Sequence, residues 1–297
     1  MIQLYNIGIH FFGLFIRFAS LFNYKARLFV SGRKNWSEAL KNIDSNQKTV
    51  WFHCSSLGEF EQGRPLIEKI KTQNPSWQIL LTFFSPFGYE IHKNYKYAEQ
   101  RVYFPLDTPK NARRFIQQVQ PDKVFFVKYE FWYFFLKELH RQNISTFLIS
   151  GVFRKSQYFF KWYGNAFRKM IDWFEYIFVQ DNSSLEVLQS FGYYNAQLSG
   201  DTRLDRVRDL VKNARELPLL DTFRQNQRLF IAGSTWPRDE ELIFRFYEQY
   251  EKPFKMVIAP HEVHASNIAR LEANLHKYTI VKFSEATTEK LREADIL

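Results

Sequence analysis

Short apolar runs alternate with helical patterns from residue 48 onward. This alternation is the feature that most limits which folds the chain can adopt. The runs are rich in β-branched and aromatic residues, as buried strands are. In the first two thirds of the chain they fall at 49–55, 78–84, 101–106, 123–128, 145–151, 176–180 and 198–200. Helices are predicted at 60–70, 111–118 and 156–174. This order is typical of successive βα units and predicts a doubly wound α/β domain with a parallel sheet.

A second series of the same kind follows a polar, helical stretch at 205–227, whose proline-containing part (ELPLLDTF) is predicted to be a linker. Predicted strands lie at 228–233, 255–260 and 278–283, helices near 238–250 and 264–275, and the opening of a fourth strand at 294–297. A length of 297 residues also favours two domains. Since a parallel sheet is covered on both faces, we expect the second domain to be truncated, with about 100 residues absent.

Cysteine content and charge narrow the class of protein. The single cysteine, Cys54, excludes an internal disulfide and a zinc knuckle, and is typical of a reducing compartment. The formal net charge is +10. The first acidic residue is Glu38, and the chain before it carries only positive charges. These cations are Arg17, Lys25, Arg27, Arg33 and Lys34. Such clustering favours an anionic surface beside the N-terminus over a nucleic-acid partner, and no protein partner is expected.

The N-terminal segment, residues 1–24, is apolar and aromatic and is predicted to be a membrane anchor. No small-residue cleavage site follows it, so a removed signal peptide is not expected. His10 and Arg17 interrupt it, so both an interfacial helix and a short, tilted anchor are open, and the anchor is favoured. A buried core helix is the remaining alternative. The trailing cations predict that the rest of the chain lies on the cytoplasmic side.

The residues after the first predicted strand are candidates for chemistry, because ligands bind beyond the carboxyl ends of parallel strands. Ser55, Ser56 and Gly58 form a predicted turn into a helix whose first turn carries Glu59. A helix start can hold an anion or position a carboxylate. The alternative is that Glu59 only compensates the helix dipole.

The segment SLGEFEQGRPLI resembles the Ser-Val/Leu-Gly-Glu segment of the 3-deoxy-D-manno-octulosonic acid (Kdo) transferase family. The resemblance implies that Glu59 is the catalytic base. It also implies that Ser55, Ser56, Gly58 and Gln62 line the substrate pocket.

Further segments resemble the family in the same order along the chain, which one chance match would not produce. They are TFFSPFGYE (82–90), YFPLDTP (103–109) and VKYEFWYF (127–134). The last implies that Glu130 stabilises the transition state, with Lys128 where the family has an acidic residue. Core packing is the alternative for Phe131 and Trp132.

Two basic segments resemble the parts of the family that handle charge. GVFRKSQ (151–157) implies that Arg154 and Lys155 bind phosphates of the acceptor lipid. SGDTRLDRV (199–207) implies that Arg203 replaces a lysine that stabilises the transition state. A surface salt bridge to a neighbouring aspartate is the alternative for Arg203.

In the second series, AGSTWPRDEE (232–241) and IAPHEVH (258–264) resemble the family's nucleotide contacts. The resemblance implies that Ser234, Thr235, Pro260 and His261 bind the donor, with His261 where the family has arginine. A metal at His261 and its neighbours is a weaker alternative than a helix start, and neither a metal nor a cofactor is expected.

The resemblance runs from about residue 25 to the last residue and implies a GT-B architecture of two Rossmann-like domains. Residues 25–212 would bind the acceptor and 213–297 would be part of the CMP-sugar domain. The implied reaction is inverting, metal-independent transfer of Kdo from CMP-Kdo to the lipid A precursor (lipid IVA), in lipopolysaccharide synthesis at the cell inner membrane. Two alternatives stay open: another GT-B transferase with a lipid-linked acceptor, and an inactive, truncated binding module.

Overall fold

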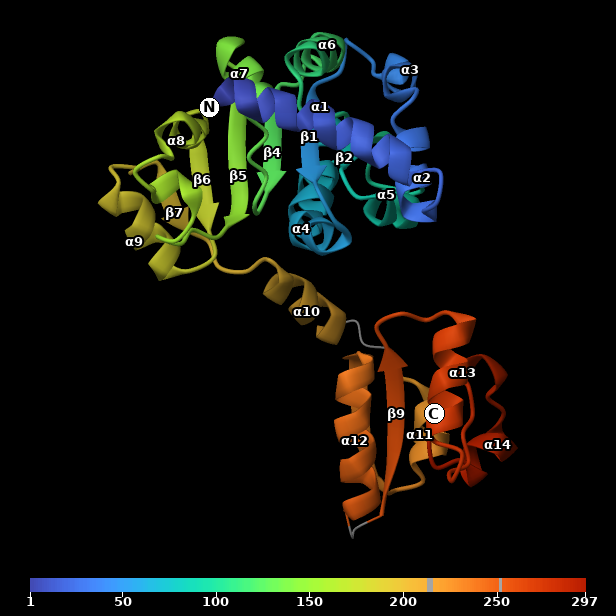
Figure 1. The fold of residues 1–297 in the computed structure, drawn as a ribbon. Coiled ribbons are helices and arrows are strands. Elements are labelled where there is room, and N and C mark those ends of the chain that lie inside the picture. The colour runs from blue at the N-terminus through green and yellow to red at the C-terminus, as the bar shows by residue number, and fades with distance from the viewer. Residues whose placement is uncertain (213–215, 251–252) are drawn as a thin grey trace. The chain divides into compact units, whose positions relative to one another are not determined.

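The computed structural model describes residues 1–212, 216–250 and 253–297. It divides into two compact units, Met1–Lys212 and Asn213–Leu297 (Figure 1). The first residue of the predicted donor domain, at 213, lies outside the described residues.

The first unit contains a parallel seven-stranded sheet in the order β3-β2-β1-β4-β5-β6-β7. Its strands are β1 (Thr49–Cys54), β2 (Gln78–Phe83), β3 (Gln100–Tyr103), β4 (Lys123–Val127), β5 (Ser145–Gly151), β6 (Tyr176–Val179) and β7 (Ala196–Leu198). Six of the seven predicted strands of this unit are confirmed, and the seventh, predicted at 198–200, lies earlier in the chain as β7. The order reverses between β1 and β4, where a doubly wound sheet places its ligand.

The helices of the first unit precede, connect and follow these strands. They are α1 (Ile2–Ala19), α2 (Tyr24–Gly32), α3 (Trp36–Ala39), α4 (Leu57–Gln73), α5 (Pro86–His92), α6 (Pro109–Val119), α7 (Tyr133–Arg141), α8 (Asn165–Asp172), α9 (Asn182–Ser190) and α10 (Arg203–Lys212), with short 3-10 turns at Leu40–Asn42 and Tyr158–Phe160. The predicted helical stretch at 156–174 is confirmed only in part. The chain bends at Gly164, where a Cβ atom would lie 1.8 Å from the Tyr158 carbonyl oxygen, so the stretch forms a 3-10 turn followed by α8.

Two apolar cores lie on the two faces of the seven-stranded sheet. Strand β1 shows the division, because Trp51 belongs to one core, whereas Val50 and Phe52 belong to the other. Successive side chains of a strand point to opposite faces, so a strand that is apolar throughout fills both cores. Helices α6, α7, α8 and α9 contribute to the first core, and α4 contributes to the second.

Helix α1 contains no buried residue, so the core-helix alternative for the N-terminal segment is wrong. Helix α1 has a mean hydropathy of 1.2. Among the described residues, it alone forms a helix that is long and apolar enough to cross a membrane.

The second unit has two paired parallel strands, β8 (Arg228–Thr235) and β9 (Phe254–Pro260). Its helices are α11 (Pro218–Arg224), α12 (Pro237–Gln249), α13 (Ala265–Asn274) and α14 (Thr288–Glu293). The predicted linker is wrong, because its residues form most of α11 and bury Phe223 in the core of this unit.

The predicted strand at 278–283 is also wrong. Ile280 makes a single parallel bridge to Ile296, and Ile296 makes another to Met256 of β9. A 3-10 turn at Phe283–Glu285 then takes the chain out of strand conformation. These segments therefore extend the sheet by isolated bridges and not by full ladders.

Candidate active site

Three polar segments meet at the carboxyl ends of β1, β2 and β4, beside the point where the strand order reverses. Ser55 follows β1, Glu130 follows β4, and Thr82 lies near the end of β2. Parallel strands end at the same edge of the sheet, so residues far apart in sequence are brought together there.

Glu130 is the centre of this cluster. Its side chain is 4% exposed, and its Oε2 atom accepts hydrogen bonds from Ser55 Oγ (2.6 Å), His53 Nε2 (3.0 Å) and Trp132 Nε1. A buried carboxylate that receives several hydrogen bonds is held in one orientation. Among the described residues no lysine or arginine forms an ion pair with Glu130.

His53 extends the network into the sheet. It is fully buried, and its Nδ1 atom lies 2.8 Å from Thr82 Oγ1, which also accepts a hydrogen bond from Trp51 Nε1 at 2.8 Å. His53 and Thr82 were not predicted from the sequence as site residues. The available signal was a polar residue near the carboxyl end of an otherwise apolar strand, in each of two neighbouring strands.

The chain reverses sharply between β4 and Glu130. Lys128 has a φ of 73°, in the left-handed region that non-glycine residues seldom adopt. Its N–H donates to the Ile149 carbonyl at 2.8 Å, which fixes the turn against β5. Such backbone strain is concentrated at functional sites, and here it directs the loop that carries Glu130.

Two of the aromatic residues of this loop, Phe131 and Trp132, have different roles. Phe131 packs against Phe153, Phe159 and Phe174, so core packing, the alternative reading, describes it. Trp132 is partly buried and donates its indole N–H to Glu130, so it also belongs to the polar cluster.

Glu59 lies in the first turn of α4 and forms a capping box with Ser56. Its Oε2 atom accepts hydrogen bonds from the backbone N–H (2.7 Å) and the hydroxyl (2.8 Å) of Ser56. The helix-start alternative is therefore part of the observed geometry. Burial and then the charge of Glu130 raise the pKa of Glu59, partly offset by the Ser56 hydrogen bonds and by His53. A carboxyl group with a raised pKa and a nearby second carboxylate is typical of acid–base chemistry.

The remaining residues of the first motif differ in their surroundings. Gly58 is exposed, and a Cβ atom there would meet nothing closer than 3.9 Å, so packing does not require glycine. Gln62 is 1% exposed, and its side-chain amide helps to lower the pKa of Asp201 but makes no hydrogen bond of good geometry with any of the described residues. Buried amides without partners are rare in folded proteins, which makes Gln62 a candidate for contact with a substrate.

Arg203 lies at the start of α10 and pairs with Asp201, as the alternative reading expected. Its Nε atom is 2.9 Å from Asp201 Oδ2, and its side chain is 57% exposed. The adjacent Thr202 hydroxyl donates to the Gln62 carbonyl at 2.7 Å and lies 3.0 Å from Ser150 Oγ. The segment that carries Arg203 is thus attached to α4 and β5.

The two cations predicted to bind acceptor phosphates, Arg154 and Lys155, are exposed in the loop that follows β5. The structure does not bring them into hydrogen-bond contact with the Glu130 cluster.

In the second unit, the predicted donor-binding residues come together at the carboxyl ends of β8 and β9. The His261 N–H donates to the Thr235 carbonyl at 3.0 Å, and Trp236 stacks on the His261 ring. Ser234 has a left-handed φ of 55°, where the β8–β9 register shifts, and Pro260 pairs with Thr235. The Thr235 hydroxyl donates to Glu240 Oε1 at 3.0 Å, so the backbone of Thr235 is more available to a ligand than its side chain.

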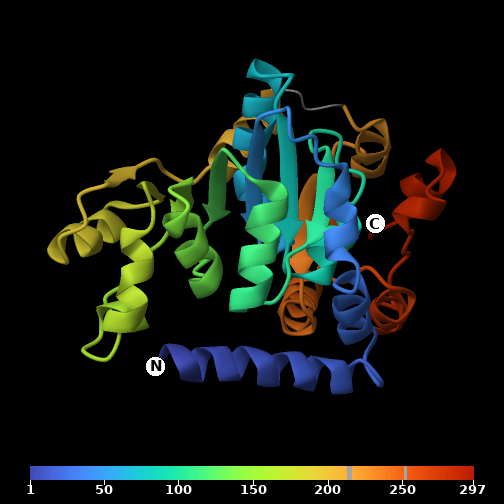
Figure 2. The same ribbon diagram turned by 90° about the horizontal axis from the view of Figure 1, so that it is seen from above.

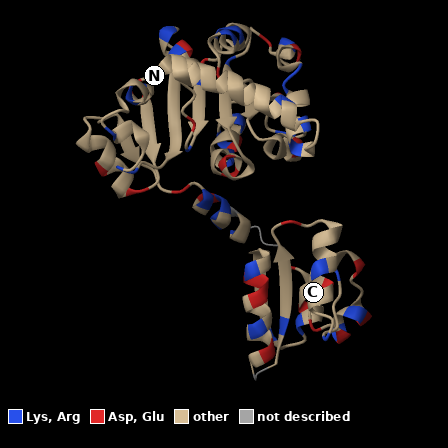
Figure 3. Ribbon diagram, viewed as in Figure 1, with Lys and Arg blue, Asp and Glu red and all other residues tan. Residues whose placement is uncertain are grey.

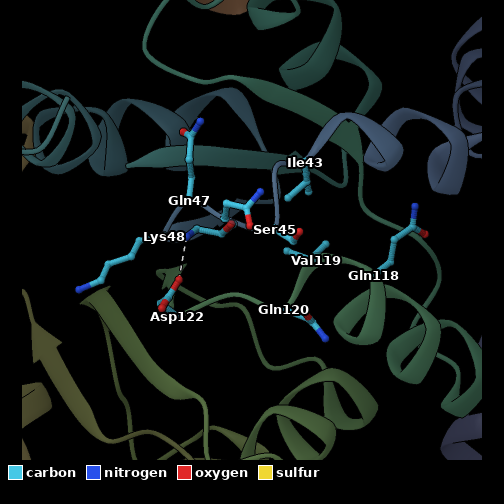
Figure 4. Close-up of a pocket in the computed structure, with 10 residues that line it drawn as sticks. Ile43, Ser45, Gln47, Lys48, Gln118, Val119, Gln120 and Asp122 are labelled. Atoms are coloured by element: carbon cyan, nitrogen blue, oxygen red, sulfur yellow. Dashed lines mark hydrogen bonds between the residues drawn. The ribbon is translucent and has the colours of Figure 1, made fainter. Parts of the chain in front are cut away.

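A polar cavity of about 260 Å³ lies at the other end of the first sheet (Figure 4). It is lined by residues before β1 and β4, and the Thr49 N–H donates to Asp122 Oδ2 at 2.7 Å. None of the predicted site residues lines it. In the described part of the chain there is no group of three or more His, Cys, Asp or Glu side chains arranged to hold a metal ion.

Comparison with solved structures supports the architecture. The UDP-GlcNAc 2-epimerase from Methanocaldococcus jannaschii superposes with a TM-score of 0.52 at 13% identity, covering 84% of this chain and 72% of that one. At this identity the similarity shows the fold alone. The predicted GT-B class, with Rossmann-like α/β units, is confirmed.

Comparison with known sequences is more specific. A bifunctional glycosyltransferase/methyltransferase of Fusobacterium nucleatum is 23% identical over 256 residues, which are 81% of this chain and 38% of that protein. The 3-deoxy-D-manno-octulosonic acid transferase of Haemophilus influenzae is 28% identical over 206 residues, which are 66% of this chain and 47% of that protein. The chain thus spans about half the length of the curated relatives it matches, or less.

The family profile described as 3-deoxy-D-manno-octulosonic-acid transferase (kdotransferase) matches residues 34–206, more than half of the chain and nearly all of the first unit. The match includes Ser55, Glu59, Glu130 and Arg203. We conclude that the chain belongs to the Kdo transferase family.

Proposed function

We propose that this protein transfers Kdo from CMP-Kdo to the lipid A precursor, lipid IVA, with inversion at the anomeric carbon and without a metal. Family membership supports the glycosyl transfer. The first unit would bind the acceptor, and the second unit would form part of the donor site.

The observation that carries the proposal is the pair of carboxyl groups at the carboxyl edge of the first sheet. Glu130 is fixed by three donors, and its charge helps to raise the pKa of Glu59. A carboxyl group with a raised pKa is a more effective general base than a free carboxyl group, because its pKa lies closer to the working pH.

In the proposed step, Glu59 accepts the proton of the acceptor hydroxyl as that oxygen attacks the anomeric carbon of Kdo. The new carbon–oxygen bond forms as the bond to the CMP phosphate breaks, and CMP leaves with the bonding electrons. Glu130 adds negative charge that stabilises an oxocarbenium-like centre. Arg203, Arg154 and Lys155 offset phosphate charge, and Ser55, Ser56, Gly58 and Gln62 orient the acceptor.

On the donor side, Ser234, Thr235, Pro260 and His261 are the residues proposed to contact the CMP part. Their clustering at the ends of β8 and β9 supports this assignment. The acceptor carries acyl chains, so the proposed location is the cytoplasmic side of the cell inner membrane, with α1 as the membrane contact.

The test replaces Glu59 by glutamine, which keeps an oxygen that can accept the Ser56 hydrogen bonds of the capping box. We expect Glu59→Gln to reduce Kdo transfer by about 10²- to 10⁴-fold, with thermal stability almost unchanged. The matched control is Glu61→Gln on the same helix, whose carboxylate pairs with Arg64 at 3.2 Å. Equal activity of Glu59→Gln and the control would show that Glu59 serves only as a cap.

A second candidate is transfer of another activated sugar to a lipid-linked acceptor. The relative from Fusobacterium nucleatum, which is named a bifunctional glycosyltransferase/methyltransferase, supports considering it. The two candidates are separated by assaying CMP-Kdo beside other nucleotide sugars with the same acceptor. The inactive-module alternative predicts acceptor binding without turnover of any donor.

A further inference from the structure

Helix α1 has two opposite faces of different exposure. The partly buried residues on one face are Ile2, Tyr5, Ile9, Gly13 and Ile16. The exposed apolar residues on the other face are Leu4, Ile7, Phe11, Leu14, Phe15 and Phe18. Both sets recur every three or four residues, so each forms a continuous stripe along the helix.

The partly buried stripe docks α1 along the first unit. The Tyr5 hydroxyl donates to Asp107 Oδ2 at 2.6 Å near the start of the helix. Further along, Phe12 packs against Phe29 with ring centroids 5.9 Å apart, and a Cβ atom at Gly13 would lie 2.9 Å from Leu106. Both ribbon views show α1 running alongside this unit (Figures 1 and 2). A helix held along its length lies in the plane of a membrane surface and does not cross it.

A cavity of about 440 Å³ opens beside α1, between that helix, α2 and the loop that follows β3. Three cations line it: Arg17, Arg33 and Lys34. The other lining residues are apolar or neutral, with no carboxylate among them. The combination of positive charge and apolar walls suits an anionic headgroup with hydrocarbon attached.

Arg33 is the most strongly positioned of these cations. Its guanidinium donates to the carbonyls of Phe104 (2.8 Å), Phe29 (3.1 Å) and Phe84 (2.6 Å), and stacks 3.5 Å from the Phe29 ring centroid. These three bonds use three of the five guanidinium N–H groups, which leaves two for a ligand. Burial lowers the pKa of Arg33 to about 9, so the side chain is still charged at neutral pH.

The charged side chains that line the cavity are all basic, and the carboxylate that follows lining residue Leu106, Asp107, is fully buried and accepts from the Tyr5 hydroxyl. No acidic residue precedes Glu38 in the sequence, and α1 carries one charge, at Arg17. Figure 3 shows the rest of α1 without Lys, Arg, Asp or Glu. Within the described part of the chain, Arg17, Arg33 and Lys34 form no ion pair with a carboxylate. The charge around α1 therefore complements an anionic surface.

We propose that α1 lies in the plane of an anionic bilayer with its exposed stripe among the acyl chains, and that the cavity binds the headgroup phosphate of a bilayer phospholipid. The cations hold the phosphate while Phe11, Phe15 and Phe18 enter the hydrocarbon. This inference rests on the proposed membrane location, but it is independent of which sugar the protein transfers.

The first test measures binding of the full chain to phosphatidylcholine vesicles with and without phosphatidylglycerol. The cavity variant is Arg17→Gln with Lys34→Gln. The control is Lys25→Gln with Arg27→Gln, which removes the same charge from neighbouring residues that do not line the cavity. At low salt each lost cation should weaken binding about five-fold wherever it lies near the surface.

At about 0.5 M salt, where charges are screened beyond about 4 Å, the two variants should separate. The control should bind within about two-fold of the unmodified protein, whereas the cavity variant should bind at least about five-fold more weakly. Equal binding of the two variants would overturn the headgroup site. Displacement by millimolar inorganic phosphate would assign the cavity to a free anion instead, and equal binding of the unmodified protein to neutral vesicles would overturn anion recognition.

The second test measures the depth of the two ends of α1 with Leu4→Cys and Phe18→Cys, each labelled with a fluorophore and quenched by spin-labelled lipids. The native Cys54 is fully buried and should stay unlabelled. The two positions are about 21 Å apart along the helix axis. Equal depths are expected for the in-plane helix, and depths that differ by more than half of that distance would overturn it. Neither test requires transferase activity, so failure of the proposed reaction would not be mistaken for failure of this inference.

Discussion

The two units follow the same βα rhythm in sequence but differ in how completely they form a sheet. The first pairs all seven of its strands, whereas the second pairs β8 with β9 and attaches Ile280 and Ile296 by single bridges. Beside Ile296 an apolar cavity of about 500 Å³ is lined by residues such as Val257, Leu271 and Leu297. An apolar run therefore becomes a strand only where a neighbouring strand and covering helices complete it.

Each unit also buries a carboxylate near the carboxyl edge of its sheet. In the second unit, Glu240 is 1% exposed, accepts from Thr235, and is paired with Arg270. In the first unit, Glu130 accepts from Ser55, His53 and Trp132. An arginine partner neutralises Glu240, which is typical of a structural ion pair, whereas the charge of Glu130 acts on Glu59.

Truncation of a core aromatic residue should separate the two units most clearly. Phe104→Ala removes a fully buried ring next to His53 and Phe135 in the first unit, and should cost about 4 kcal/mol. Phe223→Ala in the smaller core of the second unit should cost about 2 to 3 kcal/mol, because open space nearby allows the site to relax. Urea unfolding followed by circular dichroism measures both. Equal losses would contradict the difference in packing.

Removal of the buried carboxylates tests the comparison of the two polar clusters. Glu130→Ala leaves the buried His53 and the partly buried Ser55 and Trp132 without their common acceptor and should cost about 3 kcal/mol. Glu240→Ala should cost about 1 to 2 kcal/mol, because Arg270 is partly exposed and can turn to water. The free energies of unfolding decide the order. A larger loss for Glu240→Ala would show that the second cluster is the more tightly built.

Helix caps should show no difference between the units, because capping is local. Ser56→Ala removes the cap of α4. Thr287→Ala removes the cap of α14, because the Thr287 hydroxyl accepts from the Lys290 N–H. Each should cost about 1 kcal/mol. Ser56→Thr, which keeps the hydroxyl, is the control. A loss several times larger at Ser56 would mean that its contact with Glu59 stabilises more than the helix end.

The smallest expected effect is a pH dependence confined to the first unit. The pKa of Glu59 is raised in the folded state, mainly by burial, so the folded chain binds its proton more tightly than the unfolded chain. Stability should therefore fall as the pH rises from the ordinary glutamate pKa through the raised one. Glu59→Gln should reduce this dependence in unfolding measured across that pH range, and should leave the part due to Asp107, whose pKa burial raises to about 6. An unchanged profile in the variant would assign the dependence to another group.

The parts of the site that were predictable from the sequence are those set by neighbours a few residues apart. Ser56 and Glu59 are three residues apart in a recognisable helix-start pattern, and the capping box follows from that spacing. Glu130 was found through its resemblance to the family. Its contact with His53 spans 77 residues, and no local sequence pattern predicts that contact.

The βα order, six of the seven strands of the first unit, the helix start at Glu59 and the apolar character of residues 1–24 could all be predicted from the sequence. These depend on side-chain periodicity and on hydrogen bonds within one turn, which short segments specify. The folded chain was needed to show that His53 and Thr82 join Glu130, that Ile280 stays outside a full ladder, and that α1 docks along the first unit. Each of those outcomes depends on which distant surface lies opposite the residue, because burial and pairing are properties of two segments together.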